Sequence, residues 1–235
     1  MNNFSKLFII IFALSFSTSI HAAMDDDPII FSIKVDEFEW LDKSDGNAFE
    51  WGLEAWVGKD RDKLWLKSEG ERMDDETEEF DIQLLYNRAI ATFWDLQIGL
   101  RHNFQDAVER DWLVLGFAGE APGFIHTEAS VFLGEGGIIA FHFESSYELF
   151  FTQRLSLHPK LEVDWYNEDD FQNRIGAGLA SVELGLRLNY AIRRNLMPYI
   201  GINWSILSGA TANIANLDGL DDSDLQGLVG ISWSF

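Results

Sequence analysis

Apolar and polar residues alternate with a period of two along most of the chain from residue 31 onward. Between residues 49 and 57, for example, Phe49, Trp51 and Leu53 alternate with Glu50 and Gly52. A period of two indicates β-strands with one apolar and one polar face. The pattern predicts twelve strands: 31–40, 49–57, 63–69, 78–88, 93–102, 112–118, 124–132, 138–149, 154–166, 181–190, 198–205 and 225–235.

Two of these strands depart from simple alternation. In the first strand the apolar positions change parity near Glu37, which predicts a β-bulge there. The sixth strand, 112–118, is apolar on both faces, so its pattern does not say which face is which.

The last strand indicates a membrane environment. Leu225, Val229 and Trp233 lie on its apolar face, and the sequence ends on Phe235. In a soluble sheet such a strand would be a bare hydrophobic edge, whereas a closed barrel in lipid has no edge. The spacing of Gly230, Trp233 and Phe235 also resembles the C-terminal assembly signal of bacterial outer-membrane proteins, although Leu228 occupies one of its polar positions. We therefore expect the barrel assembly machinery and outer-membrane lipid as partners.

The connections support the same fold class. Twelve is an even number, and the connections after odd-numbered predicted strands are longer than those after even-numbered ones, as in outer-membrane barrels. We therefore predict an all-β, transmembrane antiparallel β-barrel of about 12 strands, monomeric, in the outer membrane of a Gram-negative bacterium. Both termini would be periplasmic, and the long loops would meet lipopolysaccharide. The competing fold is a soluble β-sandwich whose apolar face forms the core.

The N-terminal segment has the features of a secretory signal peptide. Lys6 precedes the apolar run 7–16, and small residues follow, with cleavage expected after Ala22. The domain prediction is a signal peptide over 1–22, a short acidic connector over 23–30 and a barrel over 31–235. After residue 22 no apolar run is long enough for a membrane-spanning helix.

Composition narrows the function. The formal charge of −22 argues against a nucleic-acid partner, because phosphate contacts need a basic surface. The chain has no cysteine, so disulfides and thiolate metal sites are excluded. GxSxG, HExxH and phosphate-binding glycine motifs are absent, so we predict that the protein is not an enzyme.

Several long phrases resemble the copper resistance protein B family of outer-membrane barrels. They are LWLKSEGE (64–71), QLLYNRAI (83–90), FWDLQIGLRH (93–102), ELFFTQRLSLHP (148–159) and VELGLRLNYAIRRNLMPYIGI (182–202). The resemblance covers residues 36–235. It implies a role in copper resistance through copper ion binding and copper homeostasis, by sequestration or by export from the periplasm, with a periplasmic copper-handling protein as a partner. The alternative is a narrow channel or structural barrel without metal specificity.

The segment before the barrel departs from that family. Members often carry a Met- and His-rich segment there, and soft sulfur ligands select copper. This chain has AMDDDPII at 23–30, in which only Met24 offers sulfur. This argues against copper storage by that segment, and the lumen becomes the place to look for a copper ion.

Three histidines are predicted to face the lumen on consecutive strands. We predict a metal-binding site formed by His126, Glu128, His142, Glu144 and His158, because imidazole and carboxylate ligands suit Cu(II) or Zn(II). Glu148 and Glu162 are expected nearby. The competing interpretation is a network of lumen ion pairs, for which four cations are available: Arg101, Arg154, Lys160 and Arg187.

Acidic clusters occur in three of the predicted outside loops, at 74–81, 168–170 and 218–224. Solvated loops are the simpler explanation. The functional alternative is a mouth that attracts cations or bridges divalent ions to lipopolysaccharide.

Overall fold

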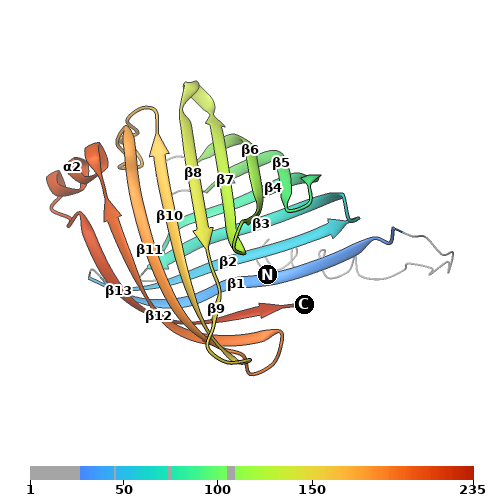
Figure 1. Cartoon of the computed structure of the whole chain (residues 1–235). Coiled ribbons are helices and arrows are strands. Elements are labelled where there is room, and N and C mark those ends of the chain that lie inside the picture. Colours follow the sequence, from blue (N-terminus) through green and yellow to red (C-terminus); the bar gives the residue numbers. More distant parts are fainter. Residues whose placement is uncertain (1–26, 45, 74–75, 105–108) are drawn as a thin grey trace, which may run out of the picture.

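The computed structural model describes residues 27–44, 46–73, 76–104 and 109–235. The predicted signal peptide at 1–22 and residues 23–26 of the predicted connector lie outside this part. Within it, thirteen strand segments form one antiparallel sheet, which closes because β10 pairs with β11 (Figure 1). The strands are β1 (Ile30–Lys43), β2 (Gly46–Gly58), β3 (Asp62–Met73), β4 (Glu76–Ala91), β5 (Trp94–Asn103), β6 (Arg110–Ala121), β7 (Ile125–Gly134), β8 (Ile139–Ser146), β9 (Leu149–Phe150), β10 (Leu155–Tyr166), β11 (Gly178–Tyr190), β12 (Leu196–Leu207) and β13 (Ser223–Ser234). A 3₁₀ turn, η1 (Glu135–Gly137), and one helix, α2 (Gly209–Leu217), lie between strands.

The barrel has twelve staves, by which we mean strand positions around its circumference, because β8 and β9 both pair with β10 and act as one interrupted strand. The interruption at 147–148 faces Pro159 of β10. Pro159 has no N–H to donate, although its carbonyl still accepts a bond from the Tyr147 N–H. The predicted twelve-stranded antiparallel barrel is therefore confirmed.

Burial is inverted relative to a soluble protein. Large apolar side chains cover the outer surface, such as Leu100 and Ile200, which are 62% and 61% exposed. The most buried side chains include Glu39, Asp81 and Asn87, which face the lumen. A β-sandwich would bury the apolar face, so this arrangement fits a barrel surrounded by lipid.

The predicted bulge lies where the sequence placed it. Val35 pairs with Leu53 but Glu37 pairs with Gly52, so β1 contains one extra residue between these pairs. The bulge changes which parity faces outward, so Phe38 is exposed on the outer surface while Glu37 contacts lumen cations.

The two ends of the barrel differ. We call the end that carries the C-terminus the terminal rim, and the opposite end, which carries α2, the α2 rim (Figure 1). The turns at the terminal rim are short, for example 59–61 and 122–124, while the α2 rim carries the two longest connections, 167–177 and 208–222. None of the helices described here is both long and apolar enough to span a membrane.

Two connections that were expected to be long are only two residues long, 44–45 and 74–75, because the strands on either side extend further than predicted. Near the α2 rim, where these strands end, the outward-facing residues are polar, such as Asp42 and Arg72. Strands that rise above the lipid no longer need apolar outer faces, so the alternation that marks them disappears. The predicted acidic loop 74–81 thus lies mostly in β4, and its first two residues lie outside the described part of the chain.

The orientation of β6, which its sequence left open, is fixed by burial. Trp112 and Val114 face the lumen and are buried, whereas Leu113 and Leu115 are exposed on the outer surface. The two inward residues join a buried apolar cluster of the inner wall, which consists of Leu85, Trp112, Val114, Phe132, Ile138 and Ala140. A second buried apolar cluster consists of Leu41, Ala48, Tyr199 and Leu228. The inner wall is therefore mostly polar but carries apolar patches.

Candidate metal site in the barrel lumen

A row of four glutamates crosses four consecutive staves of the inner wall. Glu128 of β7 pairs with Glu144 of β8, Glu144 pairs with Glu162 of β10, and Glu162 pairs with Glu183 of β11. Residues directly opposite one another have Cβ atoms about 5 Å apart, and like charges in such pairs are destabilising. This row therefore requires cations, either from the protein or from solution.

His142, Glu144 and Glu162 form the metal-compatible cluster in this row. Each contributes one potential ligand atom, and these atoms lie within 4.8 Å of one another. All three side chains are half-buried, so a small ion can reach them from the lumen. We call these three residues the lumen cluster.

Asp164 fixes the orientation of the His142 ring. The Asp164 residue lies opposite His142 across β8 and β10, and its Oδ1 is 2.8 Å from His142 Nδ1. Its second oxygen, Oδ2, accepts a hydrogen bond of 2.9 Å from the Ser181 hydroxyl. Because Nδ1 is engaged by a carboxylate, Nε2 is the ring nitrogen left to bind a metal, as in many histidine metal sites.

The donor set matches borderline and hard divalent ions. One imidazole and two carboxylates suit Cu(II) or Zn(II), whereas Cu(I) prefers sulfur ligands. No methionine or cysteine belongs to the cluster, so its chemistry favours copper in the +2 state.

Lys160 already contacts both carboxylates of the cluster. Its Nζ is 2.8 Å from Glu162 and 3.5 Å from Glu144, and its side chain is only 13% exposed. The same Nζ is 3.0 Å from Glu37, which extends from the non-neighbouring strand β1. Ion pairs of this kind match the competing interpretation of a lumen charge network, so both features occur in one place.

The other residues of the predicted site lie in two further places. His126 Nε2 is 3.4 Å from Glu128, and Glu128 in turn is 2.8 Å from Lys67 of β3. His158 pairs across the strands with Arg187, a cation that disfavours a metal ion nearby. The structure thus joins His142 and Glu144 with Glu162 and separates them from His158, while the assignment of ligands stays a prediction.

Sequence reasoning missed Asp164 and Glu37. Asp164 was recognisable, since it has the same parity as Glu162 on β10 and therefore faces the lumen too. Glu37 was harder, because its contact with Lys160 joins residues 123 positions apart on strands that are not neighbours. No local pattern reports such a contact.

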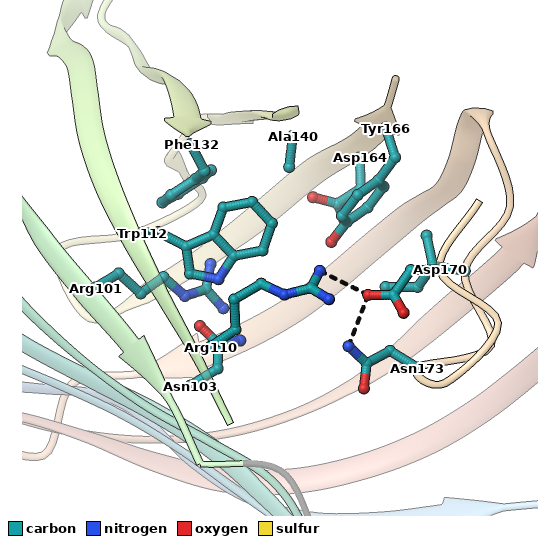
Figure 2. A pocket seen from close by; sticks show the side chains of 11 residues that line it. Arg101, Asn103, Arg110, Trp112, Phe132, Ala140, Asp164, Tyr166, Asp170 and Asn173 are labelled. Carbon is teal, nitrogen blue, oxygen red and sulfur yellow. Dashed lines mark hydrogen bonds and ion pairs between the residues drawn. The ribbon is translucent and has the colours of Figure 1, made fainter. Parts of the chain in front are cut away.

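A small cavity of about 50 Å³ lies beside Asp164, the hydrogen-bond partner of His142 (Figure 2). Asp164 lines it together with Trp112, Tyr166 and two arginines, Arg101 and Arg110. The connection 167–177 supplies three further lining residues, Asp170, Asn173 and Ile175. Asp170 of this connection forms a 2.6 Å ion pair with Arg110 and accepts a 2.8 Å hydrogen bond from the Asn173 side-chain amide (Figure 2).

Comparison with known proteins identifies the family. Residues 29–235 match the family model described as copper resistance protein B precursor (CopB). The chain is 40% identical over 208 residues to copper resistance protein B of Escherichia coli, covering 88% of this chain and 70% of that protein. It is 38% identical over 196 residues to the copper resistance protein B homolog of Pseudomonas syringae pv. tomato, covering 83% of this chain and 67% of that protein.

Solved structures show the same fold. The NanC porin superposes with a TM-score of 0.59 at 14% identity, covering 86% of this chain and 98% of that chain. At this identity the likeness concerns the fold alone, and it is the fold of transmembrane antiparallel barrels. The family model and the two relatives together establish the identity: the chain belongs to the copper resistance protein B family.

Proposed function

We propose that this protein binds copper ions in its lumen, with His142, Glu144 and Glu162 as ligands, and serves copper homeostasis without catalysing a reaction. The observation that carries the proposal is the lumen cluster, a histidine oriented by Asp164 beside two carboxylates of an acidic row. When bound, the ion would be cargo held by side chains of β8 and β10.

Two further facts support this proposal. The family is defined by copper resistance, and the cluster supplies the ligand types that Cu(II) accepts. A site of this kind would serve either the sequestration of copper or its movement across the membrane. The alternative is a narrow channel or structural barrel without metal specificity, in which the lumen acids serve only to pair with Lys67, Lys160 and Arg187.

The cellular setting belongs to the same proposal. The long connections gather at the α2 rim and the short turns at the terminal rim, the asymmetry of outer-membrane barrels with both termini in the periplasm. We propose a monomer that contacts outer-membrane lipid and lipopolysaccharide, is inserted by the barrel assembly machinery, and exchanges copper with a periplasmic copper-handling protein.

The test is Cu(II) binding by the purified, refolded barrel. The double variant His142→Ala/Glu162→Gln should lose binding, because it removes the imidazole and one carboxylate. His158→Ala is the matched control, since it removes a lumen histidine that lies opposite Arg187 rather than in the cluster. Equal Cu(II) affinity of the parent and the double variant would rule out the cluster. Growth of a deletion strain across a copper series, complemented with each variant, connects binding with resistance.

A further inference from the structure

We infer that Lys160 is a tethered cation that competes with the metal ion for Glu144 and Glu162, and that Glu37 holds the Lys160 ammonium when a metal is bound. This inference rests on the proposed function, because it concerns control of the same site. It assigns roles to a lysine and a glutamate that are not ligands.

The geometry places the ammonium among the ligand oxygens. Lys160 precedes Glu162 by two residues on β10, so both side chains leave the strand on the lumen side. Its Nζ lies 2.8 Å from Glu162 and 3.5 Å from Glu144, the two carboxylates that would also hold the metal. A divalent ion at these oxygens would repel an ammonium in contact with them, so the metal and Lys160 exclude each other.

Glu37 gives the ammonium a partner that is not one of the proposed ligands. Its Oε1 is 3.0 Å from Lys160 Nζ and 3.2 Å from the Arg187 guanidinium, which fixes Glu37 from the other side. Arg187 is itself held by a fork of two bonds to Glu39, 2.5 Å and 3.1 Å long. Because a lysine side chain is a flexible stem, Lys160 can leave Glu144 and Glu162 while keeping Glu37.

The bulge in β1 makes this arrangement possible. It turns Glu37 and Glu39 inward, whereas the uninterrupted alternation of the preceding residues would have turned them toward lipid. The fold thus provides a fixed carboxylate beside the metal site whose partner is the competing lysine.

Competition between Lys160 and the metal ion affects both the empty and the occupied site. A buried carboxylate pair without a counterion is costly, and Lys160 removes that cost when no metal is present. When a metal arrives, it must displace the ammonium, which weakens binding and speeds release. Such a site suits the passage of an ion through the lumen better than its permanent storage.

The first test compares two lysine variants by Cu(II) titration of the refolded barrel. Lys160→Gln should bind Cu(II) about tenfold more tightly than the parent, the effect of removing one competing ion pair. Lys67→Gln is the matched control. It removes the same charge from the lumen, but Lys67 contacts Glu54 and Glu128 rather than Glu144 and Glu162. Lys160→Arg keeps a competing cation and should bind Cu(II) no more tightly than the parent.

The second test uses Glu37 and keeps the lysine in place. Glu37→Gln removes the alternative partner of Lys160, so Cu(II) binding should weaken. In the Lys160→Gln background the same change should have little effect, because no ammonium is left to be held. If Glu37→Gln weakens Cu(II) binding equally in both backgrounds, Glu37 acts on the metal ion through its negative charge and not through Lys160. That result would overturn the inference.

The outcomes separate this inference from the proposed function. If the parent binds Cu(II) at the lumen cluster and Lys160→Gln binds no better than Lys67→Gln, competition is wrong and the site stands. If neither the parent nor Lys160→Gln binds Cu(II), the proposed function fails, and the competition with it. Folding of each variant is checked by its resistance to SDS before heating. If Lys160→Gln does not fold, Glu37→Gln in the parent background still tests the inference, because Cu(II) binding that is unchanged or tighter in that variant would overturn it.

Discussion

The lumen cluster depends on Asp164 at the level of single residues, although Asp164 would not touch the metal. Its carboxylate orients His142 and is itself fixed by Ser181. We predict that Asp164→Asn lowers Cu(II) affinity by about 10- to 100-fold, as changes in the partners of metal-binding histidines generally do. Isothermal titration of the refolded protein measures this. Glu183→Gln is the control, since it removes an equal charge from the acidic row at a side chain that bonds Asn203; an equal loss there would contradict the orienting role.

A second residue-scale prediction concerns closure of the barrel. Gly230 of β13 lies under the Tyr199 ring of β12, and a Cβ added there would stand 2.6 Å from two ring carbons. Gly230→Ala should therefore displace the ring and destabilise the barrel by about 1–3 kcal/mol, the usual cost of overpacking. The measurement is the fraction of refolded protein that migrates as a folded band without heating.

Gly227 supplies the control for that experiment. It lies on the same strand, and an added Cβ would meet nothing within 4 Å. Gly227→Ala should refold like the parent. If both variants refold equally well, the Tyr199–Gly230 contact does not matter for assembly. The sequence had singled out Gly230 as part of an assembly signal, and the structure adds the ring that covers it.

At the scale of elements, the connection 167–177, which we call the strap, forms part of the cavity wall. Asp170 is only 7% exposed and pairs with Arg110 of β6, while the strap also bonds α2 through Gly176 N–H and the Thr211 hydroxyl. Asp170→Asn should release the strap and increase trypsin cleavage after Arg174, whose side chain is 66% exposed. Limited proteolysis of the refolded protein checks this. Glu168→Gln, at an exposed acid of the same strap, should leave the cleavage rate unchanged; faster cleavage in that variant would show that Arg110 does not set it.

The existence of strands was predictable from sequence, while their ends were not. Alternation arises where one face of a strand meets lipid and the other faces the lumen. Each of the twelve predicted strands contains such a stretch, and each is present in the structure. Near the α2 rim both faces meet polar surroundings, and β1 and β3 continue there without any periodic signal. The interruption between β8 and β9 lies opposite Pro159 of a neighbouring strand, a position that the pattern of β8 itself cannot report.

The whole molecule adds contacts that no sequence pattern contains. The parity of each strand predicted that His142, Glu144 and Glu162 face inward, and adjacent pairing brought them near one another. The ion pairs Lys67–Glu128 and Lys160–Glu37 instead connect strands that are not neighbours in the sheet. They depend on the diameter of the closed barrel and on the bulge in β1, which together decide which side chains meet across the lumen.

The charge of the lumen leads to a final prediction, on ion selectivity. Three of the four glutamates of the acidic row contact a lysine directly: Glu128 pairs with Lys67, and Glu144 and Glu162 pair with Lys160, whereas Glu183 accepts a hydrogen bond from Asn203. Both lysines also pair with other acids, Lys67 with Glu54 and Lys160 with Glu37. The row therefore keeps a negative excess, which attracts cations and repels anions. In planar bilayers under a salt gradient, the reversal potential should show preference for cations. Glu144→Gln/Glu162→Gln should reduce that preference, whereas Asp221→Asn/Asp222→Asn, two exposed acids of the α2 rim, should change it much less at physiological salt, where charges outside the pore are screened within about 8 Å. Added Cu(II) should reduce the current of the parent and not that of the double glutamate variant, because only the parent keeps both carboxylates of the proposed copper site. A current that Cu(II) leaves unchanged in both would favour a channel without metal specificity.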